Sequence, residues 1–250
     1  MIRGLDEQTN SNAGRVRPWV LVFIVVMSGV LASPSWVSAE DEKALKEVRS
    51  VVHKLQARYE KTKDLQAEFT QKTKVEGFST PITSSGRLQI KRPGRLRWDY
   101  LDPSREEIYV NQDDVKMFVP EHQQVLVGKL TQMSASKAPL QLLQGIAKLD
   151  SEFDITPAPG DARGAGGLPL VNLVPRGGEG QTVRPYQAIV LEVHPKTSYI
   201  KSLTLHELSG NVSTFEFSNV KANSGIQDSV FEFTVPPGVE VVRAPTFRAP

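Results

Sequence analysis

The chain has 250 residues, with 30 basic and 28 acidic side chains and no cysteine. A formal net charge of +2 excludes a general nucleic-acid-binding protein, which would carry a strong basic excess. Without cysteine the chain has no disulfides and cannot be acylated on a cysteine, so a hydrophobic core must stabilise it.

The N-terminal residues have the features of an export signal. Two arginines precede an apolar run over residues 19–31, and residues 37–39 supply the small-residue pattern of a cleavage site. The run is shorter than the roughly 20 residues of a membrane span, and an uncleaved anchor is the alternative. We predict a signal peptide over residues 1–39, cleaved near Ala39, and a single domain over residues 40–250.

Residues 41–63 are predicted to form an amphipathic helix. Apolar side chains recur at spacings of three and four, with lysine and glutamate between them. Such a stripe favours a helix that lies on a sheet. The stripe consists of Leu45, Val48, Val52, Leu55 and Tyr59.

From residue 65 onward the apolar period becomes alternating, which indicates strands. Short strands separated by turn residues are typical of an antiparallel sheet that curls into a barrel or sandwich. The predicted strands are 65–75, two arms within a hairpin over 86–100, 106–111, 115–119, 124–129, 169–174, 187–194, 199–208, 212–220 and 230–235.

The hairpin over residues 86–100 has one apolar and one basic face, because side chains alternate along each arm. Pro93 and Gly94 form the turn between the arms. The cation on the apolar face is either a strand-end residue that reaches solvent or a polar group at the edge of a cavity. The apolar face carries Leu88, Ile90, Arg92, Leu96, Trp98 and Tyr100, and the opposite face Arg95, Arg97 and Asp99.

The middle of the chain departs from the strand pattern. Residues 138–145 have proline at the start and glycine at the end of a two-turn helix, with Leu140 and Leu143 on one stripe. A helix this short is unstable alone and must lie on another element. Residues 157–185 are rich in glycine and are expected to form flexible loop around the strand over 169–174.

Catalytic and metal-binding patterns are missing from the sequence. The four histidines have no ligand-like spacing, and there is no nucleophile elbow or phosphate loop. Adjacent carboxylates such as Glu106 and Glu107 are expected to be solvated rather than to form a catalytic dyad. We therefore expect no enzyme activity, cofactor or metal. The alternation leaves two alternatives, a sandwich core or a curved, incompletely closed barrel whose concave face binds an apolar ligand.

Three segments resemble the LolA family of periplasmic outer-membrane lipoprotein carriers. They are Leu65-Gln66-Ala67-Glu68-Phe69-Thr70-Gln71-Lys72, Lys91-Arg92-Pro93-Gly94-Arg95-Leu96-Arg97-Trp98 and Phe231-Glu232-Phe233-Thr234-Val235-Pro236-Pro237-Gly238-Val239. With the strand order and the Ala-Pro-Leu helix, the resemblance covers nearly all of residues 41–243. It implies a mainly β fold with a helical lid: an incomplete, curved antiparallel barrel of about eleven strands with a hydrophobic cavity.

The resemblance also implies a function and a binding site. Proteins of this kind take acylated lipoproteins from an inner-membrane ABC transporter and pass them to an outer-membrane receptor. Arg92 matches the family's cavity arginine, and Leu96 stands where the family usually has an aromatic residue. We expect Arg92 to donate hydrogen bonds to carbonyls of the Leu140 helix and so close the empty cavity. The expected ligand-binding residues are Arg92, Leu96, Leu88, Ile90, Trp98, Tyr100, Phe69, Leu140 and Leu143.

Three other functions remain as alternatives. The receptor of the same fold needs an acylated cysteine, which this chain lacks. A regulatory module that senses lipids or lipoproteins would need a further domain, for which residues 40–250 leave little room. A secreted hydrolase has no catalytic residues to support it. We predict a monomeric periplasmic carrier, with a glycine-rich insertion between Asp161 and Val183 to which the resemblance assigns no role.

Overall fold

The computed structural model describes residues 39–132, 137–176 and 186–243, which belong to one compact unit, Val37–Pro250. The predicted signal peptide lies outside the described residues except for Ala39, where the first helix begins. No helix of the described part has the length and apolar character needed to cross a bilayer.

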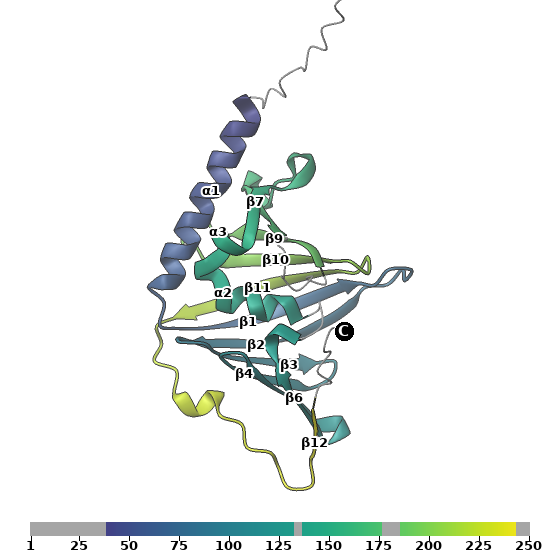
Figure 1. Ribbon diagram of the computed structural model, residues 1–250. Helices are drawn as coiled ribbons and strands as arrows, with labels where there is room; N and C mark the ends of the chain where they lie inside the picture. Colours follow the sequence, from purple (N-terminus) through teal and green to yellow (C-terminus); the bar gives the residue numbers. More distant parts are fainter. Residues whose placement is uncertain (1–38, 133–136, 177–185, 244–250) are drawn as a thin grey trace, which may run out of the picture. The chain divides into compact units, whose positions relative to one another are not determined.

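Twelve strands form one open, curved sheet (Figure 1). The strand order is β12-β6-β5-β4-β3-β2-β1-β11-β10-β9-β8-β7, and every pair is antiparallel except β12 with β6. The strands are β1 (Asp64–Lys74), β2 (Ile82–Lys91), β3 (Arg95–Asp102), β4 (Glu106–Asn111), β5 (Asp114–Val119), β6 (Gln124–Lys129), β7 (Phe153–Pro157), β8 (Leu170–Pro175), β9 (Tyr186–Val193), β10 (Ile200–Glu207), β11 (Val212–Ala222) and β12 (Glu240–Arg243).

Helices cover one face of this sheet. The long α1 (Ala39–Glu60) has acidic residues in its first turn and Arg58 in its last, as the helix dipole favours. The other described α-helices are α2 (Ala138–Gly145) and α3 (Leu149–Glu152). Short 3₁₀ turns of the described residues lie at several places and do not all cover this face: η1 (Pro120–His122), η2 (Leu130–Gln132), η4 (Ile146–Lys148), η5 (Pro159–Asp161), η6 (Ala165–Gly167) and η7 (Asp228–Phe231).

The hydrophobic core lies between the helices and the concave face of the sheet. From α1 it takes the predicted stripe, with Val48, Val52, Leu55 and Tyr59 buried and Leu45 partly buried. Strands at both ends of the sheet contribute to the same cluster, including Ile108 of β4 and Leu173 of β8. The sheet and the helices therefore contribute side chains to one hydrophobic core.

Most predicted strands are confirmed, but the chain after β11 differs from expectation. Residues 230–235 were predicted to be a strand, with Phe231 and Phe233 on one face. This is wrong, because the segment contains η7 and then extended chain that crosses the outer face of the sheet. The true last strand is β12, which pairs in parallel with β6 at the sheet edge. A further strand at the opposite edge, β7, was not predicted.

The described part of the glycine-rich segment is more ordered than expected. Its loop between β7 and β8 is joined to α1 by an ion pair between Arg163 Nη1 and Glu47 Oε2 at 2.8 Å. The backbone N–H of Ala165 donates to Glu192 Oε1 at 3.2 Å, and a Cβ at Gly164 would lie 2.8 Å from the same carboxyl carbon. A side chain at position 164 would require the Glu192 carboxylate to shift. Residues 177–185 lie outside the described ranges.

Candidate functional site

The predicted apolar face of the hairpin points into the core. Leu88, Leu96 and Trp98 are at most 2 % exposed and Ile90 is 9 % exposed, whereas Arg95 and Arg97 lie on the outer face. The register between β2 and β3 pairs Leu88 with Trp98 and Ile90 with Leu96. The alternation read from the sequence therefore assigns both faces correctly.

Aromatic rings form the centre of this inner face. The ring centroid of Phe69 lies 4.4 Å from that of Trp98 and 5.2 Å from that of Tyr100. Phe215 of β11 meets Trp98 edge-on at 5.6 Å. Phe69 can lie across β2 because residue 86 is glycine: a Cβ there would be 2.7 Å from the Phe69 ring and 1.9 Å from a backbone oxygen. Edge-to-face pairs of this kind are favourable beyond the area they bury.

The cluster also contains polar groups. The Tyr100 hydroxyl donates to Gln71 Oε1 at 2.8 Å, and burial raises the pKa of Tyr100 above its ordinary value. Within the described part of the chain, Trp98 Nε1 is buried without a hydrogen bond of normal geometry, although the indole N–H is close enough to Tyr100 to act to lower the pKa of that hydroxyl.

Helix α2 closes the inner face: it lies next to β10, and its Leu140 lies near Trp98 of β3 and Ile108 of β4. Leu140 and Leu143 are 2 % and 3 % exposed and belong to the core cluster, together with Ile146 just beyond the helix. Polar contacts hold the helix at its rim: Gln141 Nε2 donates to Leu130 O at 2.6 Å and Gln144 Nε2 to Gly94 O at 3.3 Å. The helix predicted over residues 138–145 is thus confirmed. Its apolar side chains pack into the core, and two glutamine side chains bond to backbone carbonyls at its edge.

At the start of this helix an ion pair adds a further tether. Lys137 Nζ contacts Glu106 Oε1, and the same ammonium group lies 5.0 Å from the centroid of the Tyr100 ring. Glu106 is therefore a partner of the lid rather than a freely solvated carboxylate. The sequence placed Glu106 on a strand but gave no signal for this contact.

The interior is closed in this conformation. The gap between α2, the end of α1 and the sheet has a free volume of only about 10 Å³. One water molecule needs about that much space, so no acyl chain fits without movement of the helices. The gap is lined by Tyr59, Leu65, Ala67, Leu88, Leu143, Tyr199, Ile200, Phe217 and Val220.

Two tyrosines at this gap were not among the predicted site residues. Tyr59 meets Tyr199 edge-on with centroids 5.4 Å apart, and the Tyr199 hydroxyl forms a 3.0 Å hydrogen bond with Thr62 Oγ1. Burial raises the pKa of Tyr59, while a backbone hydrogen bond at Ile200 and the charge of Arg92 act to lower it. The helical stripe identified Tyr59 as a core residue, but its proximity to β10 depends on tertiary structure.

Arg92 differs from the expectation. Its backbone N–H donates to Lys63 O at 2.8 Å, but its half-buried guanidinium has no hydrogen bond or ion pair among the described residues. The expected hydrogen bonds to carbonyls of α2 are absent from this conformation, and Gln144 makes the contact between helix and turn instead. Arg92 does not line the apolar gap, but its charge acts on Tyr59, which does.

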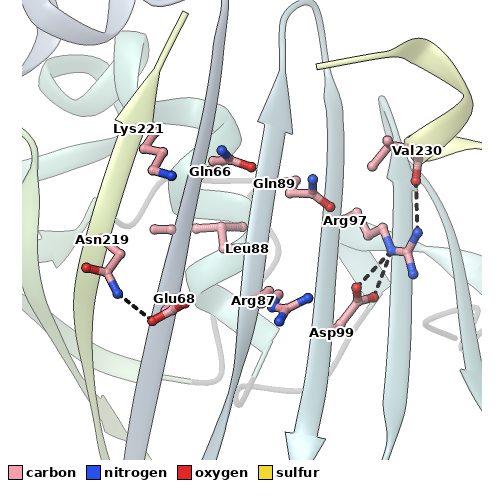
Figure 2. A pocket seen from close by; sticks show the side chains of 11 residues that line it. Gln66, Glu68, Arg87, Leu88, Gln89, Arg97, Asp99, Asn219, Lys221 and Val230 are labelled. Carbon is pink, nitrogen blue, oxygen red and sulfur yellow. Dashed lines mark hydrogen bonds and ion pairs between the residues drawn. The ribbon is translucent and has the colours of Figure 1, made fainter. Parts of the chain in front are cut away.

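On the other side of the sheet lies a polar hollow of about 410 Å³ (Figure 2). Arg97 borders it and is fixed by Asp99 at 2.9 Å and by the carbonyl of Val230 at 3.3 Å. Asn219 donates to Glu68 at 2.6 Å on the opposite side. The hollow is polar and open, so it does not suit an acyl chain.

Comparison with known proteins decides the family. The profile described as "Outer membrane lipoprotein carrier protein LolA" matches residues 60–234. The chain belongs to the LolA family. It is 29 % identical over 181 residues to an outer-membrane lipoprotein carrier protein of Dechloromonas aromatica. The alignment covers 72 % of this chain and 82 % of that protein.

Other relatives have the same description. An outer-membrane lipoprotein carrier protein of Methylobacillus flagellatus is 27 % identical over 191 residues, covering 76 % of this chain and 88 % of the relative. Among solved structures, a LolA superfamily protein from Nitrosomonas europaea aligns with a TM-score of 0.42 and 12 % identity, over 75 % of this chain and 98 % of that one.

Proposed function

We propose that this protein is a periplasmic carrier that covers the acyl chains of outer-membrane lipoproteins and delivers them to the outer membrane. The name shared by its relatives supports this function. The observation that carries it in the structure is a continuous apolar sheet face closed by a short helix. Burial of one methylene is worth about 0.8 kcal/mol, so acyl chains need such a cover to cross water.

The structure supports loading by displacement of α2. An acyl chain in contact with Leu88, Leu96 and Trp98 would replace the apolar contacts that Leu140 and Leu143 make in the closed form. One set of apolar contacts is exchanged for another, so the net affinity stays moderate. Moderate affinity suits a carrier, which must also release its cargo.

The proposed ligand-binding residues are those of the inner face and lid together with Arg92. The family assignment further supports an inner-membrane lipoprotein-releasing ABC transporter as the donor and an outer-membrane receptor as the acceptor. Residues 1–39 would act as the export signal that brings the chain to the periplasm, where it would work as a monomer.

Site-specific photo-crosslinking tests this function. A photoreactive phenylalanine analogue at Leu143, which lines the gap, should crosslink in cells to lipid-modified proteins identified by mass spectrometry. The same analogue at Arg87, which borders the outer hollow, is the matched control and should give no acylated product. Equal labelling at the two positions, or none at Leu143, would contradict the proposal.

A further inference from the structure

Two hairpin ends lie side by side at one end of the sheet, where the β1–β2 and β10–β11 turns meet (Figure 1). Lys74 is in register with Val212, and the N–H of Glu76 donates to Asn211 Oδ1 at 3.0 Å. A Cβ at Gly210 would lie 3.2 Å from the Glu76 side chain. The two turns, residues 75–82 and 208–211, are here called the paired tip.

The paired tip exposes large apolar side chains. Phe78 is 69 % exposed, Ile82 is 56 % exposed and Leu208 is 58 % exposed. These are the three highest values among the exposed large hydrophobic residues of the described chain. Single exposed apolar residues are ordinary on soluble proteins, but a group of them on neighbouring turns indicates an interaction surface.

The outermost part of the tip carries no charge. Residues 77–86 and 208–215 contain no acidic or basic side chain, and Glu76 is the single charged residue within the tip as defined. Behind the tip on β1, Lys72 and Lys74 are exposed and have no ion-pair partner within the described part of the chain. An uncharged apolar end followed by lysines matches the polarity profile of a bilayer interface, where lysine can reach the anionic headgroups.

We propose that the paired tip inserts Phe78, Ile82 and Leu208 into the headgroup region of a lipid bilayer. Residues 76–83 are exposed throughout, so the tip projects into solvent rather than packing on the rest of the described chain. A bilayer accepts a projecting apolar tip, and water remains at headgroup depth to solvate the turn backbone. The contact would hold the concave face of the protein close to a membrane surface.

The absence of native cysteine allows a direct test. Phe78→Cys in the full chain is labelled with an environment-sensitive fluorophore and mixed with vesicles of phosphatidylethanolamine and phosphatidylglycerol. The fluorescence should rise about twofold or more and become shielded from an aqueous quencher, as for a group that enters the interface. Val241→Cys, at an exposed position on β12, is the matched control and should stay unchanged.

A second measurement uses binding rather than a label. The triple change Phe78→Ser, Ile82→Ser and Leu208→Ser should weaken vesicle binding by about tenfold or more, since three apolar contacts are lost. Val241→Ser should bind like the unmodified chain. All these proteins share the apolar run at residues 19–31, so any binding through that run cancels in the comparison.

Two results would overturn the inference. One is an unchanged signal at position 78 together with unchanged vesicle binding of the triple variant. The other is a concentration-dependent dimer that the triple change abolishes while vesicles have no effect, which would make the tip an interface between copies. The vesicles contain no lipoprotein, so either result leaves the carrier function untouched.

Discussion

Arg92 is the residue whose position best separates two accounts of cargo release. If it closed the empty protein through hydrogen bonds, its loss would loosen the closed form. In the structure its guanidinium has no such bond among the described residues, so we propose that Arg92 acts on the loaded form instead. An acyl chain beside this cation would remove part of its hydration without offering a polar partner, which disfavours the loaded state.

Replacement of Arg92 by leucine should therefore favour retention of cargo. We expect Arg92→Leu to change the free energy of unfolding by no more than about 0.5 kcal/mol, because no hydrogen bond is broken. Loading should persist and discharge to acceptor membranes should slow, as followed by transfer of a radiolabelled lipoprotein. Arg87→Leu on the outer face is the control and should discharge normally. Normal discharge by Arg92→Leu would remove Arg92 from the release mechanism.

At the scale of elements, α2 is too short to be stable by itself. Its eight residues depend on the inner apolar contacts and on glutamine side chains that bond to the carbonyls of Leu130 and Gly94. Each of these hydrogen bonds contributes about 0.5–1.5 kcal/mol. The helix is therefore the part of the cover most easily detached.

Loss of both glutamines should open the lid without unfolding the sheet. In Gln141→Ala/Gln144→Ala, amide hydrogen exchange over residues 138–145 should accelerate about tenfold, as a loss of about 1.4 kcal/mol implies. An apolar dye should also bind more strongly. Exchange in β1 and β2 should stay slow. Uniform acceleration across the chain would instead mean that the glutamines stabilise the whole fold. Gln227→Ala, outside the lid, serves as the control.

Asp64 joins the start of β1 to the chain that follows β11. Its carboxylate accepts hydrogen bonds from the N–H groups of Ser224 at 2.7 Å and Gly225 at 3.1 Å. Burial acts to raise the pKa of Asp64, but these donors outweigh it and the pKa is lowered below its ordinary value. The carboxylate thus stabilises the fold in its ionised form.

The lowered pKa fixes the sign of a pH effect. The stabilisation is fully present above the unfolded-state pKa of about 3.9 and is lost as the pH falls through the lower folded-state value. Asp64→Asn should therefore be less stable than the unmodified chain at pH 7, and the difference should narrow below about pH 4. Denaturant titrations across this range measure it, with Asp150→Asn at an exposed position as control. A constant difference at every pH would contradict this prediction.

Periodicity in the sequence predicts elements well where one face is buried along the whole element. Alternation identified β2 and β3 with their correct faces, and the helical stripe identified α1. The same pattern failed at residues 230–235, because Phe231 and Phe233 alternate while packing on the outer surface rather than in a ladder. An alternating apolar pattern indicates that one side of a segment is buried. It does not indicate whether the backbone forms hydrogen bonds with a neighbouring strand.

At the scale of the whole described unit, the site is assembled from distant segments. The inner-face residues of the hairpin were predictable from local alternation. The contact of Gln144 with Gly94, and that of Tyr59 with Tyr199, each join segments that are far apart in the sequence. The sequence alone carries no signal for such pairs, so the lid helix was foreseen and its tethers were not.

The segment between β11 and β12 connects the middle of the sheet to its edge across the outer face. Asp228 forms ion pairs with Lys91 and with Arg95, whose distances are 2.5 Å and 3.0 Å. Further along, Phe233 contacts the rings of Tyr109 and Phe118 with centroids 4.9 Å and 5.5 Å away. This segment is therefore a tie across the outer side of β2 to β5, in addition to the ladders that already join these strands.

Removal of the Phe233 ring should weaken that tie. Phe233 is half-buried, so Phe233→Ala should cost about 1–2 kcal/mol, less than the loss of a fully buried phenylalanine. Because only the tie is lost, amide exchange should accelerate over residues 227–243 and in β6, which pairs with β12, and not in β9 or β10. Phe233→Leu keeps an apolar contact, so its free energy of unfolding should lie between those of Phe233→Ala and the unmodified chain. Equal acceleration in β9 would show that the segment stabilises the entire core rather than one edge of the sheet.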